Sequence, residues 1–303
     1  MGKRIPDPSG GMRMTECVIF GGLLLDKYFE IEELPERGQD GFINGEFECV
    51  GGCSVNMAVT FDNLGGKAHI VSYIGKDQTG QSIMKYMKEH HLSTRYVRER
   101  EGTTGYCMVF LEPDGERTFL TKTGMELNFS KEILSDELKG IRYAAVTGYF
   151  LLNDQTEHIV QVLEAFHRDG GYILFDPSPL VGSIDQELLR RMIRISDMVT
   201  PNTSEIGVVR EWLTGDQVVI LKRGELGGTV YEGNHSFDYL PLVVDTVDTT
   251  GAGDSFAAGA LFGIAEGKTL AESVRLGSLT SAITVGINGP HGFWKLEDKL
   301  KEL

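Results

Sequence analysis

Short apolar runs alternate with amphipathic stretches along this chain from about Cys17 onward. Such alternation is typical of repeated β-α units, whose strands lie parallel in one sheet that helices cover on both faces. The apolar runs predict strands at residues 17–25, 68–74, 143–149, 172–177, 197–201 and 217–222. The stretches between them predict helices at residues 54–64, 79–91, 154–167 and 185–195, followed by a mainly helical region at residues 252–286. We therefore expect an α/β protein with a mostly parallel central sheet.

Two regions interrupt this alternation and predict a second, smaller sheet. Residues 41–50 and 103–123 have the pattern of antiparallel strands, and the second is a hairpin turned at Pro113-Asp114-Gly115. Both faces of its first arm are apolar, so one face could cover the small sheet's own core and the other a ligand or a second subunit. We expect a β lid from about residues 27–50 and 103–123 within one domain at residues 14–303. An edge hairpin without a role is the alternative.

The charge of the chain excludes several classes of partner. With 303 residues and a formal net charge of −15, it offers no basic surface to nucleic acid or to an anionic membrane. No apolar run reaches the roughly 18 residues of a membrane span. Residues 1–13 are expected to be a disordered tail or a cloning remnant and lack the apolar stretch of a secretory signal. The four cysteines form no C-x-x-C pair, so we expect reduced thiols in a cytoplasmic protein.

The stretch DTTGAGDSFAAGA, residues 248–260, carries the strongest chemical signal. A glycine-rich turn that leads into a helix directs backbone N–H groups and the positive end of the helix dipole at one point, which makes an anion site. Gly251, Ala252 and Gly253 allow a large anion to approach the backbone. Asp254 stands beside that anion, where a carboxylate is useful if it takes a proton from an attacking hydroxyl. The stretch therefore predicts an anion hole with a neighbouring general base.

Two other nucleotide-binding motifs do not fit the sequence. The glycine turn lacks the third glycine of G-x-G-x-x-G and lies late in the chain, which argues against a dinucleotide-dependent oxidoreductase. Residues 263–269 have three residues between their glycines where a P-loop has four, and they follow a helix instead of a strand.

The motif at residues 248–254, together with CVGGCSVN at residues 49–56, resembles the two signatures of the PfkB, or ribokinase-like, family of carbohydrate kinases. The resemblance extends from about residue 16 to the end of the chain and implies a three-layer α-β-α fold with a small β-sheet lid. It implies transfer of the γ-phosphoryl group of ATP, with Mg²⁺, to a hydroxyl of a sugar, usually a primary alcohol. Asp254 matches the catalytic base, and the amides of residues 251–254 match the anion hole. Phosphoryl transfer asks a protein mainly for positioning and charge stabilisation.

The residues that the resemblance assigns to the acceptor lie in the first half of the chain. Asp26 matches the acidic residue with which such kinases bind sugar hydroxyls, although an aspartate after a strand is also an ordinary turn residue or N-cap. Gly51 and Gly52 bring backbone close to the sugar. Asn56 supplies both a donor and an acceptor. Tyr106 is expected to contact the acceptor from the lid.

The residues for the nucleotide follow the later strands. Asn202 and Glu205 match the family's N-x-x-E motif, in which Glu205 is expected to organise Mg²⁺ through water; an Asn cap on a helix is the alternative. The loop that is T-L-G-x-x-G in ribokinase keeps its glycines here as Gly224 and Gly227. Lys222 replaces the threonine of that loop and could either reach the phosphates or be a solvated cation.

The resemblance also suggests a monovalent cation beside the anion hole. The carboxylate of Asp248 and the carbonyl of Thr250 match part of a K⁺ site, which the loop at residues 286–293 would complete. Asn288 in this loop is expected to contact the nucleotide.

The sequence favours an unphosphorylated acceptor such as ribose or fructose. Asp176 either assists the metal or is a turn residue after a strand, and Leu180 stands where fructokinase-like relatives often carry an arginine. A phosphorylated sugar would need such a cation. A nucleoside kinase of the adenosine, cytidine or pseudouridine type is the alternative, because aromatic residues could line a slot for the base. These residues are Phe29, Phe42, Tyr106, Phe110 and Tyr149.

Two further expectations concern activity and assembly. A catalytically silent relative that binds sugar or nucleotide as a regulator is a third possibility, but the intact Asp254 and glycine turn argue against it. Lids of this kind often pair between two subunits, so a homodimer through the lid is expected.

Overall fold

The structure is a computed structural model that describes residues 14–113, 115–127, 138–153 and 155–302. The predicted tail at residues 1–13 lies outside the described residues, as does Asp114 in the predicted hairpin turn. Among the described residues, no helix combines the length and the apolar character needed to cross a bilayer.

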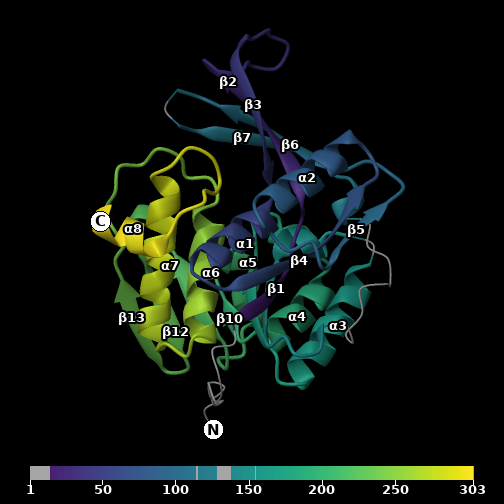
Figure 1. The fold of residues 1–303 in the computed structure, drawn as a ribbon. Coiled ribbons are helices and arrows are strands. Elements are labelled where there is room, and N and C mark those ends of the chain that lie inside the picture. Colours follow the sequence, from purple (N-terminus) through teal and green to yellow (C-terminus); the bar gives the residue numbers. More distant parts are fainter. Residues whose placement is uncertain (1–13, 114, 128–137, 154, 303) are drawn as a thin grey trace.

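A nine-stranded sheet forms the centre of the molecule (Figure 1), with the strand order β13-β12-β11-β10-β9-β8-β1-β4-β5. Every pair from β11 to β5 along this order is parallel, and only β12 and β13 run antiparallel to their neighbours. This confirms the α/β prediction. The strands are β1 (Glu16–Phe20), β4 (Lys67–Gly75), β5 (Val97–Arg100), β8 (Tyr143–Thr147), β9 (Tyr172–Asp176), β10 (Met198–Val199), β11 (Val218–Lys222), β12 (Gly228–Glu232) and β13 (His235–Tyr239).

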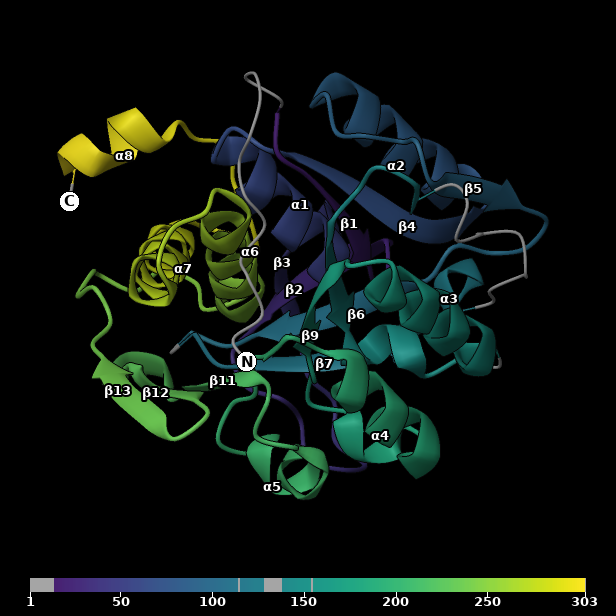
Figure 2. The same cartoon turned by 90° about the horizontal axis from the view of Figure 1, so that it is seen from below.

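Helices cover both faces of this sheet (Figure 2), because its central strands are apolar on both sides. Along β1, Cys17 and Ile19 belong to one core cluster, and Val18 and Phe20 belong to the other. The first cluster is completed by α1 (Cys53–Asn63), α2 (Gln78–Glu89), α6 (Ala252–Ala265) and α7 (Leu270–Val285). The second is completed by α3 (Thr156–Arg168), α4 (Gln186–Ile195) and α5 (Ile206–Val209). A last helix, α8, spans Leu296–Glu302.

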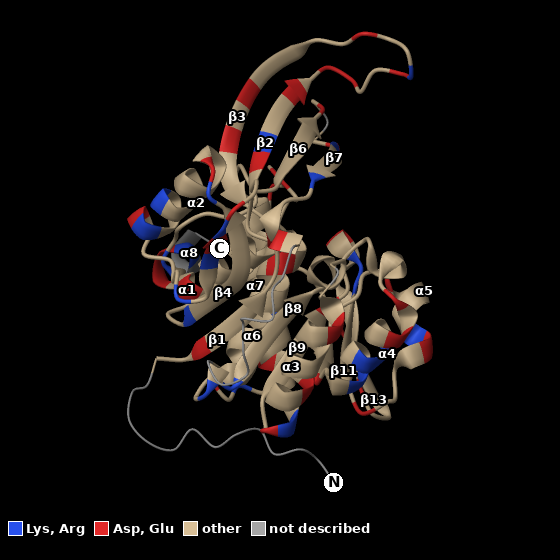
Figure 3. Ribbon diagram, turned by 90° about the vertical axis from the view of Figure 1, so that its right-hand side faces the viewer, with Lys and Arg blue, Asp and Glu red and all other residues tan. Residues whose placement is uncertain are grey.

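The predicted second sheet is present and stands above the body (Figure 1). Its strand order is β3-β2-β6-β7, with β2 parallel to β6 and antiparallel to β3. Acidic residues recur along β2 and β3, where the ribbon is red in Figure 3. We call this sheet the lid. Its strands are β2 (Leu24–Ile31), β3 (Ile43–Gly51), β6 (Tyr106–Leu111) and β7 (Arg117–Lys122).

The apolar run at residues 17–25, predicted as one strand, is divided between the two sheets. β1 ends at Phe20 in the body, and β2 begins at Leu24 in the lid. Gly21 lies between them, where an added Cβ would be 2.9 Å from Ser54 Cβ at the start of α1. The chain therefore leaves the central sheet at a point where it passes close to a helix, and hydrophobicity alone does not reveal that change of sheet.

Helices α6 and α7 pack closely because small residues face each other. A Cβ at Gly259 of α6 would lie 2.4 Å from Thr280 Oγ1 and 2.9 Å from the Cα of Gly277. The hydroxyl of Thr280 donates to the carbonyl of Ser255 at 2.7 Å, one turn from the start of α6. This contact fixes the position of the helix that begins at the predicted anion hole.

Replacing Gly259 by alanine is expected to lower the free energy of unfolding by roughly 1–3 kcal/mol, because an overpacked methyl group must push α6 and α7 apart. The midpoint of urea unfolding measures this change. Gly207 in α5 is the matched control, since no atom lies within 4 Å of its added Cβ and alanine there should be neutral or stabilise by about 0.5–1 kcal/mol. Equal effects of Gly259→Ala and Gly207→Ala would contradict this packing.

Candidate active site

Helix α6 begins at a glycine that no other residue could replace without movement. Gly251 is the N-cap, with a left-handed φ of 75°, and an added Cβ would lie 2.0 Å from the carbonyl oxygen of Pro290. Its own carbonyl accepts the N–H of Ser255 at 2.8 Å, which opens the helix. The N–H groups of the first turn of any helix lack partners within that helix. The predicted anion hole at residues 251–254 therefore lies at a true helix N-terminus.

Asp254 projects from the first turn of α6 toward helix α1. The amide Nδ2 of Asn56 donates to Asp254 Oδ2 at 2.8 Å. Burial, aided by the charge of Asp176, raises the pKa of Asp254 to about 7, although Asn56 and Lys222 act in the opposite direction. No ion pair of Asp254 occurs within 4 Å among the described residues. The carboxyl group is thus available to exchange a proton near neutral pH.

Asp26 supplies a second carboxyl group to the same site from strand β2 of the lid. Its side chain is buried, and a Cβ on Gly51 would lie 2.0 Å from Asp26 Oδ2, so glycine is needed beside it. Burial, together with the negative charge of Asp254, raises the pKa of Asp26 to about 7, while the N–H of Gly52 counteracts this shift by hydrogen bonding. The structure therefore brings together Asp26, the glycine pair and Asp254, as the sequence predicted.

Lys222 lies beside the start of α6, at the carboxyl end of β11. A Cβ on Gly253 would be 3.4 Å from Lys222 Nζ, and the ammonium group forms an ion pair of 2.7 Å with Asp176 Oδ2. The hydroxyl of Thr200 donates to the same oxygen at 2.9 Å. Asp176, at the end of β9, thus holds a cation at the helix N-terminus. This pair excludes the alternative of a solvated lysine.

Asn202 and Glu205 follow strand β10 and are bonded to each other. Glu205 Oε1 accepts from Asn202 Nδ2 at 2.8 Å, and Glu205 Oε2 accepts from the backbone N–H of Asn202 at 2.9 Å. Burial, and then the charge of Asp176, raise the pKa of Glu205. Asn202 Oδ1 also accepts the N–H of Glu205 at 3.0 Å, so the asparagine caps the turn that presents the glutamate. Asn202 can therefore be both a cap of this turn and a residue of the predicted nucleotide site.

Two buried hydroxyl groups at the carboxyl ends of the central strands have no hydrogen-bond partner within the described protein. They are Thr147 Oγ1, at the end of β8, and Ser178 Oγ, just after β9. Ser178 also has a left-handed φ of 64°, which is uncommon outside glycine. Unpaired buried hydroxyls and local backbone strain are features that gather at ligand sites.

An arginine of the lid occupies the position where the resemblance suggested K⁺. Arg117 Nη2 of β7 lies 2.8 Å from Asp248 Oδ1, and both side chains are 6% exposed. The carboxylate also accepts the N–H groups of Thr250 at 2.7 Å and Gly289 at 2.9 Å. With its charge neutralised and both oxygens in use, Asp248 does not suit a monovalent cation. The predicted ligand set of Asp248 and Thr250 therefore does not fit K⁺ in this geometry.

The four remaining predicted residues are Tyr106, Asn288, Gly224 and Gly227. Tyr106 pairs with Leu25 across the lid, so its side chain is on the face opposite to that of Asp26, and Lys27 Nζ lies 5.3 Å from its ring centroid. Asn288 is exposed in the loop after α7. Gly224 and Gly227, in the loop after β11, both have positive φ values, of 57° and 74°.

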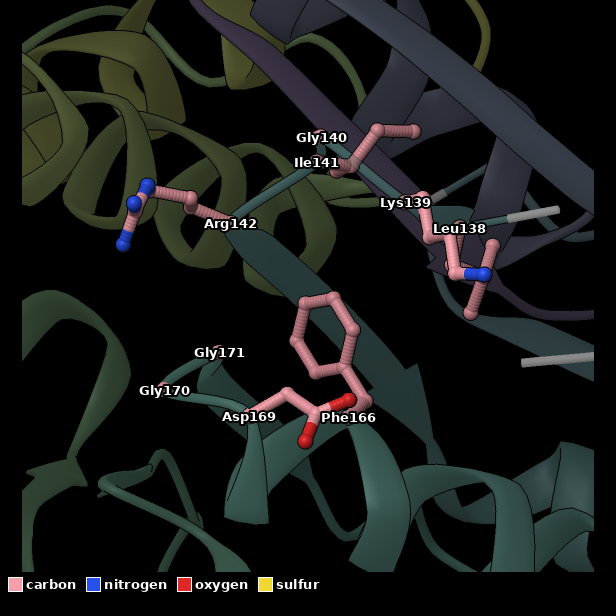
Figure 4. Close-up of a pocket in the computed structure, with 9 residues that line it drawn as sticks. All are labelled: Leu138, Lys139, Gly140, Ile141, Arg142, Phe166, Asp169, Gly170 and Gly171. Carbon is pink, nitrogen blue, oxygen red and sulfur yellow. The ribbon is translucent and has the colours of Figure 1, made fainter. Parts of the chain in front are cut away.

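A shallow hollow on the body is not this site (Figure 4). Its lining residues include Arg142 and Gly171, which precede β8 and β9 at their amino ends. The carboxyl groups described above gather at the carboxyl ends of the strands, where ligands bind in open α/β sheets.

Comparison with known proteins agrees with the geometry. The family described as pfkB family carbohydrate kinase matches residues 14–294. An uncharacterised sugar kinase of Escherichia coli, YegV, is 29% identical over 288 residues, which cover 90% of this chain and 89% of the relative. A nucleoside kinase of Burkholderia thailandensis in complex with inosine has a TM-score of 0.80 at 25% identity and covers 92% of this chain and 94% of its own.

A more distant structure shows the same fold. The ribokinase of Cryptococcus neoformans in complex with ADP has a TM-score of 0.83 at 19% identity and covers 95% of this chain and 100% of its own. The extent of the family match and the glycine turn before Asp254 lead to one conclusion: the chain belongs to the pfkB family of carbohydrate kinases, which are phosphotransferases that act on an alcohol group.

Proposed function

We propose that this kinase transfers the γ-phosphoryl group of ATP to a hydroxyl group of a small, unphosphorylated sugar. The observation that carries the proposal is the convergence of Asp254 and Asp26 at the N-terminus of α6, where one carboxyl group neighbours the anion hole and the other comes from the lid. The E. coli relative named a sugar kinase supports a sugar as the acceptor.

Each residue has a distinct part in the proposed mechanism. Asp26 accepts hydrogen bonds from sugar hydroxyls and holds the acceptor against the backbone of Gly51 and Gly52. Asp254 accepts the proton of the attacking hydroxyl, which makes the oxygen a better nucleophile. The N–H groups at residues 251–254 and the ammonium group of Lys222 stabilise the charge on the transferred phosphoryl group.

The charges around the phosphate site fit a divalent cation. Asp176, Glu205 and Asp254 place three carboxyl groups near the single ammonium group of Lys222. Glu205 is held by Asn202, so a water molecule is a natural bridge between it and the ion. Mg²⁺ supplies neutralisation of the phosphate charges during transfer. Asp176 is paired with Lys222, so Glu205 is the residue that would hold it.

A nucleoside is the second candidate for the acceptor. Tyr149, in the turn Gly148–Leu151 after β8, is half-buried; burial raises the pKa of its hydroxyl, and the nearby charges of Asp254 and Glu205 add to this shift. An aromatic ring beside the acceptor suits stacking on a nucleobase. The B. thailandensis relative in complex with inosine supports this candidate.

We also propose that two copies of the chain associate through their lids. Several large apolar side chains of the lid are exposed, which is unusual for a surface that faces only water. They are Phe42 (87%), Ile43 (55%), Phe119 (51%) and Leu120 (58%).

Asp254→Asn should reduce kcat by about 10²–10⁴-fold, the usual contribution of a general base. The amide has nearly the same shape, so the affinity for ADP measured by calorimetry should change little. Asp169→Asn is the control, because Asp169 lines the hollow at the opposite end of the sheet and should retain full activity. Near-normal turnover by Asp254→Asn would remove Asp254 from its proposed role.

The rate should fall as the pH drops through about 7. Asp254 must be ionised to accept a proton, and its pKa is raised to about 7, as is that of Asp26. The acid limb of the kcat/KM profile is therefore expected near neutral pH, well above the ordinary aspartate value of about 3.9. A profile that stays flat down to about pH 5 would contradict the environment described for both carboxyl groups.

A panel of sugars and nucleosides with Mg-ATP, followed by ADP formation, identifies the acceptor class. A pentose or hexose should give the highest kcat/KM. Activity with nucleosides alone would select the second candidate, and ADP release that no acceptor stimulates would exclude both.

A further inference from the structure

A chain of three side-chain hydrogen bonds leads from Asp254 through Asn56 and His291 to Tyr86, and the mechanism above does not use the histidine. Asn56 Nδ2 donates to Asp254 Oδ2 at 2.8 Å, and Asn56 Oδ1 lies 2.9 Å from Nδ1 of His291. The other ring nitrogen of His291, Nε2, lies 2.8 Å from the hydroxyl oxygen of Tyr86. Helices α6, α1 and α2 and the loop after α7 each contribute one of these four side chains.

Chemistry fixes the direction of every bond in this chain. The ionised carboxylate of Asp254 can only accept, so Asn56 must present its NH₂ group and keep its carbonyl oxygen for the histidine. That oxygen can only accept, so Nδ1 of His291 must carry the proton. In a neutral imidazole the other nitrogen is then an acceptor, and Tyr86 donates to it. Burial, with a further effect of His90, lowers the pKa of His291 to about 4 and keeps the ring neutral.

The loop that carries His291 is fixed on both sides of the histidine. The carbonyl oxygen of Pro290 packs against Gly251, the N-cap of α6, and would be 2.0 Å from a Cβ added there. The carbonyl oxygen of Gly292 accepts from Asn63 Nδ2 of α1 at 2.8 Å. The ring of His291 is therefore held between the two helices that bear Asn56 and Asp254.

We propose that His291 is a positioning residue for phosphoryl transfer: its Nδ1–H fixes the Asn56 amide so that the NH₂ group holds the Asp254 carboxylate in place. The inference rests on the proposed function, because it assigns Asn56 and His291 to the support of the base. It also changes the predicted role of Asn56. Both the NH₂ group and the carbonyl oxygen of its side chain are hydrogen-bonded to other side chains of the protein. Without the histidine, the amide is free to rotate and turn its carbonyl oxygen toward the carboxylate, which disfavours the ionised form.

Packing alone is the competing explanation for His291. Tyr86, His90 and Phe293 form an aromatic cluster with it, and the rings of His90 and Phe293 stack with centroids 4.2 Å apart. A purely structural histidine would affect stability without changing the proton affinity of Asp254. The acid limb of the pH profile therefore distinguishes the two explanations.

The other groups around Asp254 are the same in all variants of this test. Asp26 of β2 and Asp176 after β9 bring negative charge, Lys222 of β11 brings positive charge, and the thiol of Cys53 in α1 is a hydrogen-bond partner. His90, the C-cap residue of α2, is the titratable group that affects His291. A change in the acid limb therefore reports on the Asn56 amide.

Three variants, His291→Leu, His291→Asn and His90→Leu, test the proposal in the full chain with Mg-ATP and the best acceptor. His291→Leu should lower kcat by about tenfold or more and move the acid limb of kcat/KM upward by about one pH unit, which is a tenfold change in proton affinity. His291→Asn places an amide N–H near the Nδ1 position and should restore both values to within about twofold and a few tenths of a unit. His90→Leu is the matched control, because it removes a ring of the same cluster and leaves the bond to Asn56. Its acid limb should stay in place.

Two further measurements make each outcome decisive. ADP affinity should be unchanged in every variant, and urea unfolding shows which variants are folded; if His291→Leu does not fold, His291→Gln, which lacks a donor near the Nδ1 position, replaces it. An acid limb of the folded variant that matches the wild type would overturn the proposal and leave His291 a packing residue. Failure of the proposed function itself gives a different result, since Asp254→Asn would then retain its turnover.

Discussion

The N-terminus of helix α6 is the feature on which the rest of the site depends. Gly251 turns the chain in a left-handed conformation that brings it against Pro290, and the helix then begins with first-turn N–H groups that lack partners within the helix. A chain with a net charge of −15 would repel a nucleotide triphosphate over most of its surface. In the proposed mechanism, backbone amides and the partly buried Lys222 offset this repulsion locally, without a basic surface. Asp254 gains its raised pKa from the same buried position.

Two contacts link the lid to the start of this helix. One is an ion pair, and the other is the approach of Asp26 to Asp254 at the proposed acceptor site. A four-stranded sheet with a small core of its own, centred on Tyr28, Cys107 and Val109, has little to stabilise it apart from the body. Arg117 extends from β7 to Asp248, and its Nη1 also lies 3.2 Å from the hydroxyl of Thr249. A buried pair of this kind costs desolvation unless both charges are well bonded. Here it connects strand β7 of the lid to the loop that precedes helix α6.

Much of the fold could be predicted from the sequence, because it depends on local patterns. The alternation of apolar and amphipathic stretches gave the order of strands and helices, and the glycine turn before Asp254 gave the helix start. The change of sheet between Phe20 and Leu24 was missed, since the run is apolar on both sides of the break and Gly21 passes close to Ser54 only in the folded chain.

The parts of the site that escaped prediction are contacts between distant segments. Arg117 and Asp248 are over a hundred residues apart, and so are His291 and Asn56. Single arginines and histidines carry no pattern that reveals such partners. Tyr106 shows a related limit: strand periodicity placed it on a face of the lid, but only the pairing with β2 shows that this face is opposite to Asp26.

The arrangement at the start of α6 can be tested directly by a crystal structure of the protein with ADP, Mg²⁺, aluminium fluoride and its best acceptor. Aluminium fluoride occupies the position of a phosphoryl group in transfer. The account predicts that its fluorine atoms accept hydrogen bonds from the amides of residues 251–254, with the acceptor hydroxyl within about 3 Å of an Asp254 oxygen. Fluoride bound away from these amides, or an acceptor hydroxyl that meets a different base, would contradict it.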